Sequence, residues 1–213
     1  MPEAQFLWPL VAVVVISLVG AGGLVVLRAT HADSDAAYLS TEPDLRGYRV
    51  PDNLCTAAVF DSIARTGFVP VNDPYVHQRW SVARHEALDQ ATCTNSYDKA
   101  ASGGFVDARV TTVVLLHKKS NPLPDFRMQF DTARTTAGIT TEQIAGLGDS
   151  AYLTDGSGPF RTMTLSVREG WMCFRISWAL SGSIDSQQQD IPSDRKRQTL
   201  LDVARATLPG LRK

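Results

Sequence analysis

The sequence has almost no net charge, few histidines and few cysteines, and these shortages exclude several classes of protein. Its 213 residues contain 21 Lys and Arg against 22 Asp and Glu, so the formal net charge is −1. Apolar residues make up 44% of the chain and charged residues 20%. A nucleic-acid-binding domain carries a clear basic surplus, and a disordered chain has few apolar residues and a high net charge. We therefore expect a folded protein with no nucleic-acid partner.

Recognisable catalytic and cofactor motifs are also lacking. His85-Glu86-Ala87-Leu88-Asp89 begins like a zinc-protease helix, but Asp89 stands where the second histidine ligand belongs. Gly146-Leu147-Gly148-Asp149-Ser150-Ala151 fits the dinucleotide-binding fingerprint in spacing, yet it leads into a strand-like segment instead of a helix. The four histidines are otherwise scattered. We therefore predict no catalytic residue, no metal and no cofactor.

A long apolar run near the start is the most informative feature that is present. The run from Phe6 to Leu27 contains 22 residues without a charge. A helix of that length spans the roughly 30 Å hydrocarbon core of a bilayer. We predict a short cytoplasmic end over residues 1–5 and a transmembrane helix over residues 6–27. A cleaved signal peptide is the alternative, with Thr30-His31-Ala32 as the cleavage site, although residues 1–5 lack the basic residues of such a peptide.

The segment after this run is typical of a tether. Residues 28–50 have no apolar periodicity and are rich in Ala, Asp, Ser, Thr and Pro. We expect residues 51–213 to form one extracytoplasmic domain. The charges that flank the run, Glu3 and Arg28, give almost no orientation signal, but long domains cross the membrane largely regardless of charge. The expected location is therefore the cell membrane, with a single pass and the C-terminal domain outside.

Apolar spacing beyond Pro51 predicts a mixture of helices and strands. The expected elements are a helix that starts at Asp52 or Asn53 and ends at Gly67, strands over Ser81–Leu88, Ala91–Tyr97 and Phe105–His117, a helix between Pro122 and Gly138, and a last helix over Ser193–Leu208. A helix over Trp80–Tyr97 is the alternative to the first two strands. Together with a hairpin before the last helix, this order implies helices packed on an antiparallel sheet. The predicted fold class is α+β, with an N-terminal transmembrane helix followed by one antiparallel sheet and about three helices.

Two segments with alternating apolar residues, Arg161 to Val167 and Met172 to Trp178, predict that hairpin. A two-residue loop at Glu169-Gly170 would give three pairs of inward residues: Val167 with Met172, Leu165 with Phe174, and Met163 with Ile176. The opposite face carries hydroxyl groups, Cys173 and Arg175. We predict that Thr164, Ser166 and Arg175 bind a ligand on this polar face.

Three cysteines in an exported domain predict one disulfide and one free thiol. The preferred pair is Cys55 with Cys93, which closes a loop of about 38 residues and stabilises the fold by about 4 kcal/mol in the chain-entropy model. Cys93 with Cys173 is the alternative pair, since both lie in expected strands. A Cys173 left over is expected to be a half-buried, inert thiol.

Several short motifs carry a family resemblance. They are Leu54-Cys55 at a helix start, Cys93 before the strands, and Ile144-Ala145-Gly146-Leu147-Gly148-Asp149-Ser150-Ala151-Tyr152 before a hairpin and a last helix. The pattern resembles uncharacterised exported cell-envelope domains of actinobacteria, often lipoproteins with two cysteines, and more distantly the extracellular sensor domains of actinobacterial membrane Ser/Thr kinases. The resemblance implies an exported α/β domain with an antiparallel sheet, a disulfide equivalent to Cys55–Cys93 and no assigned catalytic residue.

The function expected from these features is that of a membrane-anchored binding or accessory domain of the cell envelope. Its partner would be an envelope protein or a small molecule, besides the membrane bound through residues 6–27. One alternative is an envelope enzyme whose site is assembled on the polar face of the 161–178 hairpin, from Cys173 and Arg175 with a histidine. Another is a small subunit of a membrane complex, packed through Ser17, Ala21 and neighbouring glycines.

Overall fold

The structure is a computed structural model that describes residues 42–55, 57–71, 78–101, 104–156, 162–182 and 191–212. The expected cytoplasmic end, the expected transmembrane helix over residues 6–27 and the first part of the expected linker lie outside these residues. In the part of the chain that is described, no helix is long and apolar enough to cross a membrane. The membrane span therefore stays a prediction.

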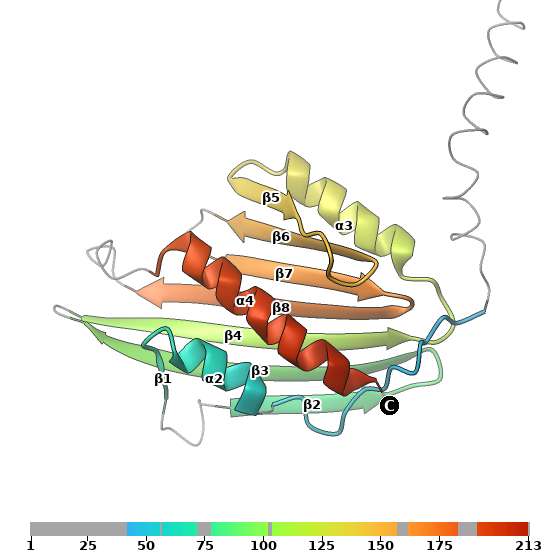
Figure 1. Ribbon diagram of the computed structural model, residues 1–213, viewed down its shortest axis with the longest axis horizontal. Helices are drawn as coiled ribbons and strands as arrows, with labels where there is room; N and C mark the ends of the chain where they lie inside the picture. The colour runs from blue at the N-terminus through green and yellow to red at the C-terminus, as the bar shows by residue number, and fades with distance from the viewer. Residues whose placement is uncertain are drawn as a thin grey trace, which may run out of the picture. The chain divides into compact units, whose positions relative to one another are not determined.

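The described residues form one antiparallel sheet of eight strands with three α-helices (Figure 1). The strands are β1 (Val69–Pro70), β2 (Gln78–Arg84), β3 (Leu88–Ala101), β4 (Gly104–His117), β5 (Ile139–Gln143), β6 (Ser150–Gly156), β7 (Thr162–Glu169) and β8 (Met172–Gly182). The helices are α2 (Ala57–Ala64), α3 (Leu123–Thr135) and α4 (Ser193–Thr207), followed by the 3-10 helix η2 (Leu208–Leu211). The spatial order of the strands is β1-β3-β4-β8-β7-β6-β5, and β2 also pairs with β3. The predicted α+β class, with one antiparallel sheet and about three helices, is confirmed.

The turn between β2 and β3 lies earlier in the chain than predicted. The strand expected over Ser81–Leu88 ends at Arg84, because the backbone N–H of His85 donates to the carbonyl of Leu88 at 3.1 Å. The His85 side chain supports this turn by accepting a hydrogen bond from the N–H of Ala87. The motif that begins like a zinc-protease helix is therefore a hairpin turn.

One face of the sheet carries the main hydrophobic core, beneath α2 and α4. Figure 1 shows α4 lying diagonally across this face, with α2 beside it. The inward residues predicted for the hairpin, among them Leu165, Ile176 and Trp178, are fully buried, in one cluster with Leu200 and Ala204 of α4. At about 25 cal/mol per Å² of apolar surface, this burial is the main stabilising contribution to the fold.

The register of the β7–β8 hairpin differs from the predicted one by two residues. The pairs are Glu169 with Met172, Val167 with Phe174, Leu165 with Ile176, and Met163 with Trp178. The two-residue loop is therefore Gly170-Trp171 instead of Glu169-Gly170. Gly170 has a φ of +57°, and a Cβ at this position would lie 2.3 Å from the carbonyl oxygen of Asp44, so only glycine fits the first loop position. The facing of every side chain is unchanged, because side chains alternate with a period of two.

Helix α3 packs on the opposite face of the sheet. Its Phe126 and Phe130 rings lie 4.9 and 4.8 Å, centroid to centroid, from the ring of Tyr152 on β6. Tyr152 pairs with Ser166 across the strands, so it belongs to the polar face of the hairpin and not to the main core. A small separate apolar contact therefore holds α3 over this second face.

The disulfide joins Cys55 to Cys93, as preferred from the sequence, and ties the segment before α2 to β3. Cys173 is free. The alternative pairing of Cys93 with Cys173 is wrong because Cys93 faces the main core and pairs with Thr112, whereas Cys173 pairs with Leu115 on the second face.

Residues 42–50, expected to belong to the tether, pack against the domain. Tyr48 and Val50 are buried, and Tyr48 forms a β-bridge with Arg212 near the chain end. The Tyr48 hydroxyl donates to Glu169 Oε2 at 2.7 Å and accepts a hydrogen bond from Arg212 Nε at 2.8 Å. The folded domain therefore starts before the predicted boundary, because the β7–β8 turn and the C-terminal end together surround an aromatic residue of the expected linker.

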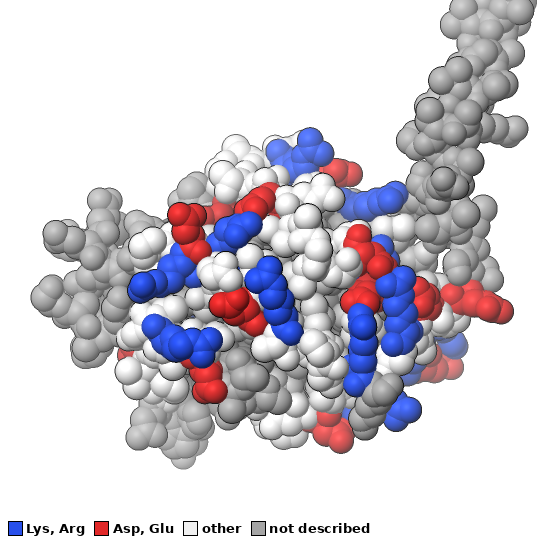
Figure 2. Space-filling model, viewed as in Figure 1, with Lys and Arg blue, Asp and Glu red and all other residues white. Residues whose placement is uncertain are grey.

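Acidic and basic side chains are interspersed on the face that α2 and α4 cover (Figure 2). Arg197 of α4, for example, donates through Nε to Glu142 of β5 at 2.9 Å. Among the described residues of this face, neither sign of charge dominates a large area. The basic residues of the last helix therefore do not form a continuous cationic surface.

The hydroxyl of Thr112 gives a test of the main core. Thr112 is 1% exposed, and its Oγ1 has no hydrogen-bond partner among the described residues. We expect Thr112→Val to leave the free energy of unfolding unchanged or to raise it by up to about 1 kcal/mol, because it removes a buried, unpaired polar group. Urea unfolding monitored by tryptophan fluorescence measures this change.

The matched control is Thr66→Val. The hydroxyl of Thr66 is buried but donates to the carbonyl of Ile63 at 2.5 Å, so its loss is expected to cost about 1 kcal/mol. Equal destabilisation by both substitutions would contradict the assignment of Thr112 as unpaired.

Candidate functional site

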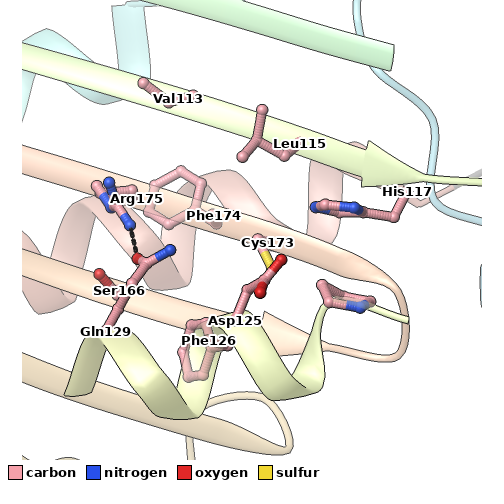
Figure 3. A pocket seen from close by; sticks show the side chains of 11 residues that line it. Val113, Leu115, His117, Asp125, Phe126, Gln129, Ser166, Cys173, Phe174 and Arg175 are labelled. Carbon is pink, nitrogen blue, oxygen red and sulfur yellow. Dashed lines mark hydrogen bonds between the residues drawn. The ribbon is translucent and has the colours of Figure 1, made fainter. Parts of the chain in front are cut away.

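A hollow lies between α3 and the second face of the sheet (Figure 3). Its volume is about 120 Å³. It is lined by residues of β4, β7, β8 and α3 and of the segment before α3: Val113, Leu115, His117, Pro122, Asp125, Phe126, Gln129, Ser166, Cys173, Phe174 and Arg175. An apolar cavity of about 150 Å³ holds a benzene molecule, so this hollow has the size for a small organic ligand or a few waters.

Strand pairing brings Arg175 and Ser166 together at one end of the hollow. They are direct partners across β8 and β7, and Val113 of β4 is the partner of Arg175 on its other side. Arg175 Nη2 donates to the side-chain oxygen of Gln129 on α3, as the dashed line in Figure 3 shows. Ser166 is 3% exposed, so a ligand that reached this end would meet both a cation and a buried hydroxyl.

The other end of the hollow is formed by His117, Cys173 and Asp125. Cys173 pairs with Leu115 across β8 and β4, and His117 follows two residues later on the same face of β4. Asp125 lies one helical turn before Gln129 on α3, and Figure 3 shows its carboxylate on the side of Cys173 and His117. This end therefore combines a carboxylate, an imidazole and a thiol.

Two opposite charges line the hollow without pairing to each other. Arg175 contacts the neutral amide of Gln129, and no ion pair of Arg175 or of Asp125 occurs among the described residues. Arg168, one strand away from Cys173, instead pairs with Asp149 at 3.4 Å. The guanidinium and the carboxylate of the hollow are therefore both available to a ligand.

Burial keeps the thiol and the imidazole of the hollow neutral. It raises the pKa of Cys173 to about 11, although Arg168 and Arg175 act in the opposite direction. Burial also lowers the pKa of His117 below its ordinary value, against the attraction of Asp125 for the proton. No hydrogen bond joins His117 to Cys173 among the contacts of the described residues. The thiol therefore lacks the activation that a nucleophilic cysteine needs.

The structure brings two of the three predicted ligand-binding residues into the hollow. Ser166 and Arg175 line it, whereas Thr164 lies outside and forms a hydrogen bond with Ser177 at 2.9 Å. Thr164 belongs to a row of hydroxyl side chains that crosses the same face of the sheet, consisting of Thr94, Thr111, Ser177, Thr164, Thr154 and Thr141.

His117, Asp125 and Gln129 also line the hollow, and they were not among the site residues predicted from the sequence. The alternation in Phe105–His117 already places His117 away from the main core, which was a usable signal. Asp125 and Gln129 gave no such signal, because their role depends on where α3 crosses the sheet.

A second hollow of about 200 Å³ lies between the start of α4 and strands β5 and β6. Its charged lining includes Glu142, Asp155, Asp194 and Arg197. Arg197 is already paired with Glu142 in this hollow, so the cation there has a partner within the protein. The α3 hollow is therefore the better candidate site.

Comparison with known proteins finds no matching family model, no matching curated protein and no matching solved structure.

The reactivity of Cys173 tests the burial of its thiol in the hollow. Only the thiolate reacts with iodoacetamide, and a pKa of about 11 keeps the thiolate fraction rising about tenfold per pH unit up to pH ~10. We expect the logarithm of the alkylation rate, followed by mass spectrometry, to rise linearly over this range. The same chain unfolded in urea is the control, and its rate should level off above pH ~9. A plateau near pH ~9 in the folded protein would contradict the burial of the thiol.

Proposed function

We propose that this protein is a membrane-anchored extracytoplasmic binding domain of the cell envelope, which holds a small ligand in the α3 hollow. The observation that carries the proposal is Arg175, a guanidinium that faces a neutral amide at the end of a partly apolar hollow. Arginine presents five donors in a planar fork, of which Gln129 uses one. Such a group, beside the buried hydroxyl of Ser166, is suited to a polar ligand that enters from outside.

The proposed location is supported by three features of the chain. The uncharged run over residues 6–27 has the length of a membrane span, and the Cys55–Cys93 disulfide is compatible with an oxidising compartment outside the cytoplasm. The motifs around Cys55, Cys93 and Gly146-Leu147-Gly148 resemble those of exported actinobacterial envelope domains. We propose that residues 6–27 anchor the domain on the outer side of the membrane.

Binding accounts for the hollow better than catalysis does. An enzyme that used Cys173 would need a thiolate near neutral pH, and burial works against the thiolate. The carboxylate of Asp125, which raises the pKa of this thiol further, adds to the same effect. The residues of the hollow are therefore suited to contacting a ligand through fixed charges and hydrogen bonds.

A blocked hollow tests this function. Gln129 is exposed on α3 and lines the hollow, so Gln129→Trp places an indole at its mouth with little cost to folding. The control is Met128→Trp, at a neighbouring position that is 60% exposed and does not line the hollow. Saturation-transfer NMR with a set of neutral, anionic, cationic and zwitterionic fragments, on the full chain in detergent micelles, measures binding.

We expect a subset of fragments to bind the unmodified chain and the Met128→Trp variant but to lose at least tenfold in affinity for Gln129→Trp. If no fragment binds, or if every fragment binds all three proteins equally, the hollow is not a ligand site and the proposal is wrong.

A further inference from the structure

The two ends of the α3 hollow carry opposite charges, and their separation defines the kind of ligand that satisfies both. This inference rests on the proposed function. Arg175 marks the cationic end, where it contacts Gln129, and Asp125 marks the anionic end, beside Cys173 and His117. Neither charge has an ion-pair partner among the described residues.

Strand β8 and helix α3 give similar spacings along the hollow, whereas His117 on β4 lies one residue pair beyond Cys173. Arg175 and Cys173 are two residues apart on β8, which corresponds to about 6.6 Å at ~3.3 Å per residue. Gln129 and Asp125 are four residues apart on α3, which corresponds to about 6 Å at ~1.5 Å per residue. Along β8 and α3, the backbone positions at the cationic end are thus roughly 6 to 7 Å from those at the anionic end, the length of several bonded carbon atoms.

Apolar side chains line the space between the two ends. Leu115 lies between Val113 and His117 on the hollow face of β4, and Phe126 follows Asp125 on α3. Hydrocarbon walls favour methylene groups over water and disfavour a second charged group in the middle of the hollow. A ligand with adjacent charges would leave one of the two protein charges unmatched.

His117 contributes a neutral group at the anionic end. Because burial lowers its pKa, the imidazole carries no charge near pH 7 and does not neutralise Asp125. A neutral imidazole also has one nitrogen that accepts a hydrogen bond. An ammonium group at this end therefore has a carboxylate and a hydrogen-bond acceptor available.

We propose that the α3 hollow binds a small unbranched amino acid whose ammonium and carboxylate groups are separated by several methylenes. The carboxylate lies against the guanidinium of Arg175 and the hydroxyl of Ser166. The ammonium lies against Asp125 and the imidazole of His117, and the methylenes contact Leu115 and Phe126. Carboxylate and guanidinium form a paired, charge-assisted contact that fixes this orientation.

Four probes of similar size test the charge spacing on the full chain in detergent micelles. They are γ-aminobutyrate, its isomer α-aminobutyrate, butyrate and butylamine. Free Cys173 lines the anionic end, so an occupied hollow should slow its alkylation by iodoacetamide, and the probe concentration that halves the rate gives the affinity. We expect γ-aminobutyrate to bind at least tenfold more tightly than each of the other three probes.

Charge-removing variants assign the two ends. We expect Arg175→Gln to abolish the preference for γ-aminobutyrate over butylamine, and Asp125→Asn to abolish its preference over butyrate. The controls are Arg109→Gln, on an exposed part of the same sheet face, and Asp131→Asn, further along α3. Both controls lie outside the hollow and should keep the full preference.

The outcomes separate this inference from the proposed function. If butyrate, butylamine or α-aminobutyrate binds as tightly as γ-aminobutyrate, the inference that the ligand carries two separated charges is wrong. The proposed binding function still stands in that case if the Gln129→Trp substitution weakens the binding of fragments. If no probe protects Cys173, the inference is also wrong. If, in addition, no fragment depends on the hollow, the proposed function fails with it.

Discussion

The alternation of side chains along β7 and β8 is the constraint on which the rest of the structure depends. Successive residues of a strand face opposite sides of the sheet, so Ile176 and Trp178 cannot enter the core without placing Arg175 and Ser177 on the other face. The inward residues, Ile176 and Trp178 among them, fill the main core under α4. The outward residues, Arg175 and Ser177 among them, form the polar second face of the sheet. Helix α3 covers part of this face, and water or a ligand must contact the rest.

The faces of the hairpin were predictable because they depend only on local alternation. The register was not, since a shift by two residues leaves every inward side chain inward and therefore fits the same apolar pattern. The structure places the loop at Gly170-Trp171, where the N–H of Trp171 donates to the carbonyl of Asp44 at 2.9 Å. This contact comes from a segment that the sequence pattern assigned to the tether, so local reasoning could not include it.

Two of the polar residues of the site, on one hairpin, were predictable from the sequence, and three were not. Ser166 and Arg175 follow from the polar face of one hairpin, which is a local feature. His117 reaches the hollow through the pairing of β4 with β8, and Asp125 reaches it through the path of α3 over the sheet. The alternation of β4 assigns His117 to the second face, but only long-range packing brings His117 and Asp125 to the same hollow.

The hollow is connected through backbone hydrogen bonds to Asp44, in the first described segment of the domain. The N–H of His117 donates to the carbonyl of Trp171 at 3.0 Å, so backbone hydrogen bonds connect the anionic end of the hollow to the β7–β8 loop and through it to Asp44. Tyr48 and Arg212 hold the same region through Glu169. Asp44 and Tyr48, the C-terminal end at Arg212 and the anionic end of the hollow thus lie at one edge of the fold.

The most direct test of this account is the pKa of His117 measured by NMR titration of its ring C–H signals in the folded, disulfide-bonded chain. If α3 covers the hollow on the second face, burial lowers the pKa of His117 more than the charge of Asp125 raises it. The titration midpoint of His117 then lies below the ordinary value of about 6.5. Protonation then disfavours the folded state, so stability falls as the pH drops below ~6.5. A midpoint at or above ~6.5 would mean that the imidazole is solvated or paired with a carboxylate. It would contradict the claim that α3 covers the hollow and buries His117.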